Sequence, residues 1–552
     1  MVVPYNTLLS KSARNAVGLS LRSSLVIIDE AHNIPEALRT LSSCQLTLPI
    51  IEGANSQLRA YVTRYASRLT GRNITYLTQI QKILVAFTKH LKSKNTKINP
   101  KRAENRLSSN TMVTATELLF AMKLDNINLF NILKYLEHSR LSQKLHGFTN
   151  SISGENGEKE LDFDDPNFIS KHISCMSLVE TFLQCLCGTE REGRVVVDVP
   201  NIEESSNLEI RKSTSLHPCF RYLLLDPSVH FKDIVDEAHA IVLAGGTLRP
   251  FPHVATELFG DDRTMVINAL TSENEVQRKK EVLTHSSISR ELTTFCCGHV
   301  ISPNNVIVTC LSGGPNNTAL DFRHCSRSAE KICNELGEAC IEVSKVIPSG
   351  LVIFFPSYTY EAHVVQHWKK CGLYDKINMQ KRIFREPKSA SEVENTLGMY
   401  SKSAVTNGAI LLCVINGKMS EGINFADDIC RGVLLCGLPF PDITDSILQE
   451  KMQLLDKEFK KNKMSITGQA YYENLCMRSV NQSIGRAIRH INDYAAIMLA
   501  DVRYSTDFKI WNKLPLWLRS GKEIPKKTSF DENIQDIMAF FHSIENRSQS
   551  LG

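Results

Sequence analysis

The pattern of apolar and polar residues separates the chain into two kinds of segment. From residue 222 onward, short continuous apolar runs are bounded by turn residues, and stretches with helical periodicity lie between many of them. The runs are YLLL (222–225), AIVLAGG (240–246), LVIFFPS (351–357), AILLCVI (409–415), GVLLCGLP (432–439) and AAIMLA (495–500). Strands that are apolar on both faces and alternate with helices are typical of a parallel sheet covered on both sides. The pattern therefore predicts an α/β architecture.

Residues 46–220 follow a different period. Stretches such as QLRAYVTRYASRL and TYLTQIQKILVAFTKHL place apolar residues at i, i+3, i+4 and i+7, which predicts amphipathic helices. Before them, MVVPYNTLL indicates the end of a strand followed by a helix, and LVII (25–28) indicates a short strand. We therefore expect a helical insertion within the α/β architecture.

Composition is that of an ordinary globular protein, with 42% hydrophobic and 22% charged residues. The longest apolar runs are far shorter than the roughly 20 residues that a membrane span needs, so we expect no membrane partner. No basic and then apolar leader follows Met1, which argues against secretion. The 16 cysteines include no Cys-x-x-Cys pair, which favours buried free thiols over a zinc or iron–sulfur site.

Charge is unevenly distributed, although the net charge is only +5. Residues 82–106 hold eight Lys and Arg against one acid, and residues 151–166 hold six acids against one Lys. The acidic segment also contains Gly, Ser and Pro, so it is expected to be a solvated loop. For the basic segment, contact with nucleic acid is an alternative to a plain solvated surface.

The four letters DEAH occur twice in the chain. Asp29 and Glu30 directly follow the strand LVII, at the carboxyl edge where ligands of open parallel sheets bind. Asp236 and Glu237 instead precede the strand AIVLAGG and close the helix-like segment HFKDIVDEAH, which places them at the opposite edge. We interpret the second copy as a helix end with surface acids.

The first copy has the chemistry of a nucleotide-hydrolysis site. Phosphoryl transfer from ATP needs Mg²⁺ across the β- and γ-phosphates and an acid to hold it, and Asp29 fits this role. A neighbouring carboxylate can orient or deprotonate the attacking water, and Glu30 fits that role. The alternative is a pair of strand-end acids that caps the next helix.

The segment NQSIGRAIRH (481–490) supports the same chemistry. Gln482, Gly485, Arg486 and Arg489 have the spacing i, i+3, i+4, i+7, which predicts one face of a helix. Two guanidinium groups suit the charge that spreads over a γ-phosphate, and such an arginine is typically worth about 10³–10⁵ in rate. The alternative is an exposed basic stripe.

Two further loops follow predicted strands. NGKMSEGINFADD (416–428) follows AILLCVI and contains Gly417, Ser420, Glu421 and Gly422. Glycines let backbone approach a ligand closely, while Ser and Glu can hold a ribose, a phosphate or an arginine. The alternative for this loop is a plain turn.

The other loop is AGGT (244–247), a small-residue loop that ends in one hydroxyl. Gly246 and Thr247 are suited to couple a nucleotide site to a moving neighbour. Because each of these segments follows a strand or faces one, together they predict a nucleotide site at the carboxyl edge.

These residues resemble the motor motifs of the XPD-like, iron–sulfur class of superfamily 2 DEAD/DEAH-box DNA helicases. GLVIFFPSY (350–358), EPKSASEVENTL (386–397), GKMSEGINF (417–425), GLPFPD (437–442) and NLCMRSVNQSIGRAIRH (474–490) are similar to its ChlR-type branch. DNINLF (125–130) and QKLHGFT (143–149) are similar to that branch too. The likeness covers nearly all of the chain.

The resemblance implies two RecA-like motor domains with a helical Arch domain inserted into the first. Residues 1–45 and 221–295 would form an incomplete first motor domain, residues 46–220 the Arch-like insertion, and residues 296–552 the second motor domain. The resemblance also assigns Asp29 and Glu30 to metal and water, and His32 to coupling with the second motor domain. Ser357 and Tyr358, with the loop 417–425, would lie toward the DNA track or the domain cleft.

The resemblance further implies that Gln482, Arg486 and Arg489 sense the γ-phosphate. The implied activity is ATP-dependent unwinding of DNA from 5′ to 3′, with ATP and Mg²⁺ as cofactors. Implied partners are single-stranded or forked DNA and proteins of replication or cohesion, in a nuclear role in DNA repair and sister-chromatid cohesion.

One motif of the family is not found in these 552 residues. A helicase of this kind needs G-x-x-x-x-G-K-[ST] to cradle the phosphates. The chain contains two Gly-Lys pairs, at 417–418 and 521–522. The motif requires a glycine five residues before each pair, but these positions are occupied by Leu412 and Leu516. In the family, this loop and the four iron–sulfur cysteines precede the DEAH strand, so none of the 16 cysteines matches a cluster position.

We therefore expect the sequence to be N-terminally truncated and its own ATP turnover to be reduced by orders of magnitude. We also expect the first motor domain to expose apolar faces and strand edges. The alternative is a catalytically inactive, truncated paralogue that acts as a DNA- or protein-binding module.

Overall fold

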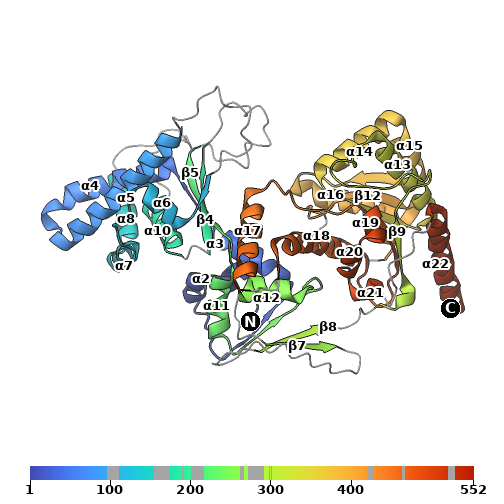
Figure 1. Cartoon of the computed structure of the whole chain (residues 1–552), viewed down its shortest axis with the longest axis horizontal. Coiled ribbons are helices and arrows are strands. Elements are labelled where there is room, and N and C mark those ends of the chain that lie inside the picture. The colour runs from blue at the N-terminus through green and yellow to red at the C-terminus, as the bar shows by residue number, and fades with distance from the viewer. Residues whose placement is uncertain are drawn as a thin grey trace. The chain divides into compact units, whose positions relative to one another are not determined.

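A computed structural model describes most of the chain, in two compact units (Figure 1). The described residues are 1–95, 111–153, 174–188, 192–199, 217–260, 266–271, 291–296, 299, 301–419, 425, 427–462, 466–519 and 529–551. The first unit comprises Met1–Ile27, Asn33–Val242 and Glu257–Gly260. The second unit comprises Ile28–His32, Leu243–Thr256 and Asp261–Gly552.

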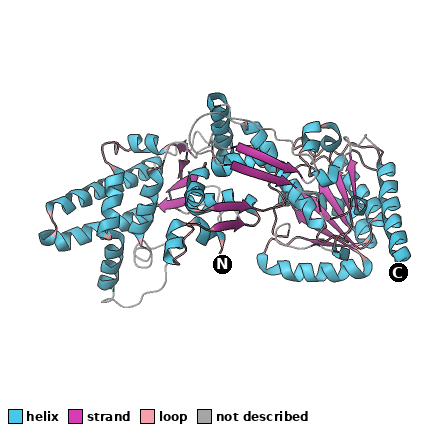
Figure 2. Ribbon diagram, turned by 90° about the horizontal axis from the view of Figure 1, so that it is seen from below, coloured by secondary structure: helices cyan, strands magenta, loops and turns pink. Residues whose placement is uncertain are grey.

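The second unit is built on a six-stranded sheet whose paired strands are all parallel (Figure 2). In spatial order the strands are β11 (Arg382–Arg385), β12 (Ala409–Val414), β10 (Gly350–Phe355), β13 (Gly432–Cys436), β14 (Ala495–Ala500) and β9 (Val306–Leu311). Phe355 is level with Val414, and Cys436 with Ala500, so the carboxyl ends meet at one edge. The predicted α/β architecture is confirmed.

The sheet of the second unit is covered on both faces. Along β10, Val352 and Phe354 belong to one core, while Leu351, Ile353 and Phe355 belong to the other, as the two-residue period of a strand requires. Helices α16 (Val393–Asn407) and α18 (Gly468–Ile484) contribute to the first core. The second core is completed by α13 (Glu330–Val346), α14 (Tyr358–Cys371), α15 (Leu373–Gln380) and α22 (Phe530–Leu551).

Smaller elements complete the second unit. Helix α17 (Ser446–Asn462) packs on α18 through a separate apolar cluster that includes Leu448 and Tyr471. The short helices are α19 (Val502–Thr506), α20 (Phe508–Asn512) and α21 (Leu516–Arg519). Strands β7 (Val266–Thr271) and β8 (Glu291–Cys296) form a two-stranded parallel sheet.

The first unit contains an antiparallel sheet packed against helices. Its strands, in spatial order, are β2 (Cys44–Thr47), β5 (Cys219–Leu224), β4 (Gly193–Asp198) and β3 (Thr111–Val113). The helices are α4 (Leu48–Tyr65), α5 (Gly71–Asn95), α6 (Ala115–Ala121), α7 (Leu129–Ser139), α8 (Leu141–Ser153) and α10 (Cys175–Leu186). The rings of Phe87, Phe182 and Phe220 meet in the shared core, with centroids 5.3–5.7 Å apart.

This sheet corrects two expectations from the sequence. The run YLLL was expected in a parallel sheet, but it belongs to β5, which pairs antiparallel with β2 and β4. A strand in the middle of a covered antiparallel sheet is apolar on both faces too, so the run alone does not give its direction. The predicted insertion is therefore not purely helical.

A short parallel pair of strands precedes the DEAH segment. Strand β1 (Leu25–Ile28) pairs with β6 (Ala240–Leu243). The amide of Ala240 donates to the carbonyl of Ser24, and the amide of Ala244 donates to the carbonyl of Ile28. Leu25 and Ile27 are 60% and 66% exposed, so the expected exposed apolar face is present. The helices nearest to these strands in the sequence are α1 (Tyr5–Leu9), α2 (Lys11–Ala16), α3 (Ile34–Ser42), α11 (Ser228–Glu237) and α12 (Phe251–Phe259).

The strand expected at the start of MVVPYNTLL is not present, because residues 1–4 have no regular structure and α1 begins at Tyr5. The expected helix is confirmed. A search of the described helices found none with the length and apolarity to cross a membrane.

Candidate functional site

The first DEAH copy forms a tight turn at the end of β1. Asp29 directly follows the strand and accepts a hydrogen bond from the amide of Glu30 (2.9 Å). Glu30 has φ = 46°, in the left-handed region that non-glycine residues rarely occupy. The amide of Ala31 then donates to the carbonyl of Ala244 (2.9 Å). Such backbone strain costs on the order of 1 kcal/mol or more and is concentrated at functional sites.

His32 joins three segments of the second unit. Its Nδ1 lies 3.1 Å from Thr247 Oγ1 and 3.3 Å from Glu30 Oε2. Its Nε2 lies 2.7 Å from the side-chain nitrogen of Gln482 on α18. The imidazole is only 9% exposed, so these contacts replace water around both ring nitrogens. The DEAH turn, the AGGT loop and α18 therefore meet at one side chain.

Electrostatics select the neutral form of this histidine. Burial lowers the pKa of His32 below 6.5, and the charges of Arg478 and Arg486 lower it further, against an opposing effect of Glu30. A neutral ring with its proton on Nδ1 donates to Thr247 Oγ1 and accepts from the Gln482 amide at Nε2. This single tautomer satisfies both hydrogen bonds.

The arginines after Gln482 are arranged differently from the prediction. Helix α18 ends at Ile484, a 3₁₀ turn follows over Gly485–Ala487, and Ile488 is extended. The prediction that Arg489 shares one helical face with Gln482 is therefore wrong. The amide of Arg489 donates to the Asp493 carboxylate (3.1 Å) rather than continuing the helical bonding pattern.

Charges around Arg489 still connect it to the DEAH turn. Burial and the charge of Arg486 lower the pKa of Arg489, and the charge of Glu30 raises it. Arg489 therefore lies within electrostatic range of both Arg486 and Glu30. Arg486, within the 3₁₀ turn, and Arg489, beyond it, are both brought near the acids of the first DEAH copy.

A buried ion pair fixes the segment that carries Arg489. Asp493 is fully buried and accepts from the Arg431 guanidinium (2.8 Å), as well as from the amides of Arg489 and Tyr494. Asp493 also lies with Asp427 and His490 in a group whose oxygen and nitrogen atoms are close enough to surround a metal ion. Arg431 already supplies the positive charge there, so the arrangement is that of a structural ion-pair network.

The loop after β12 is held by one carboxylate. Glu386 accepts from the Tyr358 hydroxyl (2.6 Å) and from the amides of Val414 (2.8 Å) and Met419 (2.9 Å). A Cβ on Gly417 would clash with the same carboxylate and with the Tyr358 hydroxyl, so a larger residue would displace them. Ser420, Glu421 and Gly422, the other predicted residues of this loop, lie outside the described residues.

Ser357 and Tyr358 lie at the carboxyl end of β10, where the sequence placed them. The Ser357 hydroxyl caps α14 by accepting from the amide of Tyr360 (3.2 Å). Burial, followed by the hydrogen bond and the charge of Glu386, raises the pKa of Tyr358 to about 12. Both residues thus support the edge of the sheet that holds the Gly417 loop.

The second DEAH copy lies at a helix end, as predicted. Helix α11 ends at Glu237, before β6 begins at Ala240. Glu237 lies 3.7 Å from the buried guanidinium of Arg14, which is a structural contact within the first unit. Asp236 is exposed.

Asp29 has the chemistry of a magnesium ligand. Its carboxylate is exposed at a strand end, beside a second carboxylate on Glu30, and Mg²⁺ prefers such oxygen donors. The residues present therefore fit the ion. When bound with ATP, Mg²⁺ neutralises charge on the β- and γ-phosphates.

Three structural residues of the site were not predicted. Glu386 occurs in the stretch EPKSASEVENTL, which drew attention only as part of a resemblance, while Arg431 and Asp493 belong to no predicted motif. A signal was available for Asp493, because an acid shortly after an arginine-rich segment can accept its backbone amides. Nothing in the local pattern indicates that Arg431, 62 residues away, completes the pair.

Two family models match parts of this chain. The family model described as a helicase C-terminal domain matches residues 340–521, and the DEAD_2 model matches residues 1–50. The first range contains the Gly417 loop and α18, and the second contains the first DEAH copy.

Relatives match along almost the whole chain. The ATP-dependent DNA helicase DDX11 of Danio rerio is 34% identical over 562 residues, which cover 94% of this chain and 58% of that protein. The ATP-dependent DNA helicase chl1 of Aspergillus clavatus is 33% identical over 561 residues, covering 98% of this chain and 69% of that protein. Among solved structures, S. tokodaii Xpd4 is similar, with 15% identity, a TM-score of 0.45, and coverage of 92% of this chain and 79% of that one.

The matching domains are those of a helicase. The chain belongs to the DDX11/CHL1 family of ATP-dependent DNA helicases, which confirms the branch expected from the sequence. The chain spans 58% of the length of the zebrafish relative.

Proposed function

We propose that these residues form the hydrolysis and coupling parts of an ATP-driven DNA helicase. The observation that carries the proposal is the position of His32, whose ring nitrogens contact Thr247 and Gln482 across sequence separations of 215 and 450 residues. A side chain that joins the DEAH turn to α18 can couple the state of a bound nucleotide to the six-stranded sheet.

In this proposal Asp29 holds Mg²⁺ and Glu30 positions the attacking water. Arg486 and Arg489 face the γ-phosphate, where their charge stabilises the transition state of phosphoryl transfer. Gln482, near the end of α18, and Gly485, at the start of the following turn, position these two arginines. His32 couples this site to the rest of the second unit.

The remaining predicted residues have supporting roles. We assign the Gly417 loop, including Ser420, Glu421 and Gly422, to the nucleotide or the domain cleft. Gly246, Thr247, Ser357 and Tyr358 act in coupling or along the DNA track. Residues 1–45 with 221–295, 46–220 and 296–552 correspond to the first motor domain, the Arch-like insertion and the second motor domain.

The proposed substrate is single-stranded or forked DNA, unwound from 5′ to 3′ with ATP and Mg²⁺ in the nucleus. We further propose roles in DNA repair and sister-chromatid cohesion, with replication or cohesion proteins as partners. Support comes from the relatives, which are named ATP-dependent DNA helicases. Because the 552 residues contain no G-x-x-x-x-G-K-[ST] motif, we propose that their own turnover is slow.

The test is DNA-stimulated ATP hydrolysis by the full chain with Mg²⁺. We expect slow hydrolysis that single-stranded DNA stimulates and that Glu30→Gln reduces by about 10²–10⁴-fold. The matched control is Asp236→Asn in the second DEAH copy, which should leave the rate unchanged. DNA binding without hydrolysis above the Glu30→Gln background would overturn the proposal in favour of a binding module.

A further inference from the structure

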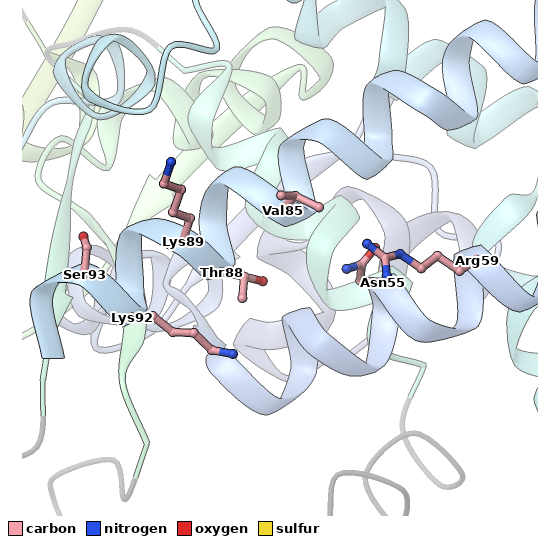
Figure 3. Close-up of a pocket in the computed structure, with 7 residues that line it drawn as sticks. All are labelled: Asn55, Arg59, Val85, Thr88, Lys89, Lys92 and Ser93. Atoms are coloured by element: carbon pink, nitrogen blue, oxygen red, sulfur yellow. The ribbon is translucent and has the colours of Figure 1, made fainter. Parts of the chain in front are cut away.

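A basic groove lies between helices α4 and α5 of the first unit (Figure 3). It is a cavity of about 520 Å³, within the roughly 300–1,000 Å³ typical of ligand pockets. Three of its lining residues are the cations Arg59, Lys89 and Lys92, and no lining residue is acidic. The groove is separate from the motor residues described above.

The lining of α5 forms a single stripe. Val85, Thr88, Lys89 and Lys92 have the spacing i, i+3, i+4, i+7, so they share one face over about 10 Å of helix. In Figure 3 the side chains of Thr88 and Lys92 point toward α4. Val85 is 42% exposed, which adds an apolar surface to the charged positions of this stripe.

The cations of the groove are not equally neutralised. Lys92 pairs with Glu52 of α4 (2.7 Å), so its charge is already partly neutralised. Within the part of the chain that the structure describes, neither Arg59 nor Lys89 forms an ion pair. Two positive charges are therefore available to an incoming ligand, one from each helix.

Asn55 supplies an unsatisfied acceptor beside these charges. It lies one turn before Arg59 on α4, and its Oδ1 is buried without a hydrogen-bond donor among the described residues. A buried acceptor left without a donor is unfavourable, because it has lost its hydrogen bonds to water. A ligand that brings an N–H group to this atom would restore a hydrogen bond there.

We propose that this groove binds an acidic segment of a partner protein, in which an aliphatic side chain is flanked by carboxylates. The carboxylates pair with Arg59 and Lys89, and the aliphatic side chain covers Val85. A peptide N–H of the segment donates to Asn55 Oδ1. The sugar–phosphate backbone of DNA has phosphates for the cations but no N–H group for Asn55 Oδ1, so the lining favours a peptide.

The experiment measures binding of a fluorescein-labelled peptide of Glu-Leu-Glu repeats to the full chain by fluorescence anisotropy. We expect saturable binding, a loss of at least about tenfold in affinity with Arg59→Glu/Lys89→Glu, and a loss of about threefold to tenfold with Asn55→Ala. A peptide of Gln-Leu-Gln repeats should bind at least about tenfold more weakly. These losses should occur without a change in the DNA-stimulated hydrolysis, so failure here is distinguishable from failure of the proposed motor function.

The matched control is Arg72→Glu/Lys82→Glu, which makes the same charge change on α5 outside the groove and should retain peptide affinity. Arg59→Ala/Lys89→Ala provides a milder second pair, and circular dichroism establishes that each variant is folded. Absence of saturable binding, or an equal loss in the control pair, would overturn the proposal. So would displacement of the peptide by a single-stranded oligonucleotide whose own binding is insensitive to Asn55→Ala, which would identify a nucleic-acid surface.

Discussion

Two parallel sheets carry the candidate motor residues, and they are supported in different ways. Every residue of β10, β12 and β14 in the six-stranded sheet is buried. In the two-stranded sheet, Leu25 and Ile27 are more than half exposed, while Val26 and Ile28 are buried. A loop that follows a buried central strand is held in place by the strands and helices that pack around that strand. A loop that follows β1 lacks such packing on one face.

The difference shows where each loop obtains its geometry. The Gly417 loop is fixed by its own sheet, because the Glu386 carboxylate accepts from the amide of Val414 at the end of β12 and from the amide of Met419 in the loop. The DEAH turn is fixed by contacts outside β1, chiefly those of His32 with Thr247 and Gln482. Substitutions in the two regions should therefore act on different properties of the protein.

The largest expected effect comes from the buried ion pair beside the six-stranded sheet. Asp493→Ala leaves the Arg431 guanidinium buried without its main partner, so we expect the free energy of unfolding to fall by about 3–5 kcal/mol. Asp428→Ala is the matched control, because Asp428 pairs with the same guanidinium (3.0 Å) but is 49% exposed. It should cost at most about 1 kcal/mol. Unfolding in guanidinium chloride, followed by tryptophan fluorescence, measures the free energy of unfolding of both variants, since all three tryptophans lie in the second unit. Equal losses in the two variants would contradict the view that Asp493 is the main partner of Arg431.

A pair of isoleucines tests the comparison of the two sheets directly. Ile353→Ala in β10 removes a fully buried side chain, and we expect a loss of about 2–5 kcal/mol. Ile27→Ala in β1 removes a side chain that is 66% exposed, and we expect a change within about 0.5 kcal/mol. Tryptophan fluorescence follows the first variant and far-ultraviolet circular dichroism follows the second. A loss above about 2 kcal/mol for Ile27→Ala would show that the exposed face of β1 is covered in solution.

The same contrast explains how much of the fold the sequence predicts. The runs that became β10, β12, β13 and β14 are uniformly apolar because both faces are buried, so their pattern is strong. Strand β11, with the sequence RIFR, has exposed ends and lies at the edge of the sheet, and no local pattern distinguishes it from a loop. Direction is also absent from such patterns, which is why β5 was placed in the wrong kind of sheet.

Prediction of the site had a similar limit. The position of Asp29 after a strand follows from local residues, as does that of the second copy at a helix end. The end of α18 at Ile484 does not, because the spacing of Gln482 and Arg489 continues the helical pattern past it. Long-range partners, such as Arg431 for Asp493, are decided by packing rather than by spacing.

The Glu386 carboxylate gives the next largest effect. Glu386→Ala leaves the amides of Val414 and Met419 without their acceptor, and we expect a loss of about 1–3 kcal/mol in the free energy of unfolding. The pKa of Tyr358 should fall from about 12 toward its ordinary value of 10.0, since a nearby negative charge and a hydrogen bond are removed. Ultraviolet absorbance of the phenolate, with Tyr358→Phe as the reference, measures the shift. An unchanged pKa would mean that burial alone sets it.

The smallest effect, and the one that most sharpens the comparison, concerns His32. Its folded-state pKa lies below 6.5, so the unfolded chain takes up the proton first as the pH falls. The stability that neutral His32 contributes is therefore complete above pH 6.5 and is lost as the pH falls from 6.5 through the lowered pKa. Gln482→Ala removes a hydrogen bond that favours the neutral ring, so it should raise this pKa and cost about 0.5–1.5 kcal/mol at neutral pH.

An NMR titration of the imidazole, assigned with His32→Gln, follows the pKa in both proteins. Asn481→Ala is the matched control, because Asn481 is the neighbouring amide on α18 and donates instead to the carbonyl of Lys513 (3.0 Å). If His32 titrates above 6.5 in the wild type, the charge of Glu30 outweighs burial, and the histidine would carry a positive charge into its contact with Gln482. The DEAH turn would then be held by an ion pair, and its geometry would no longer depend on α18 in the way that separates it from the Gly417 loop.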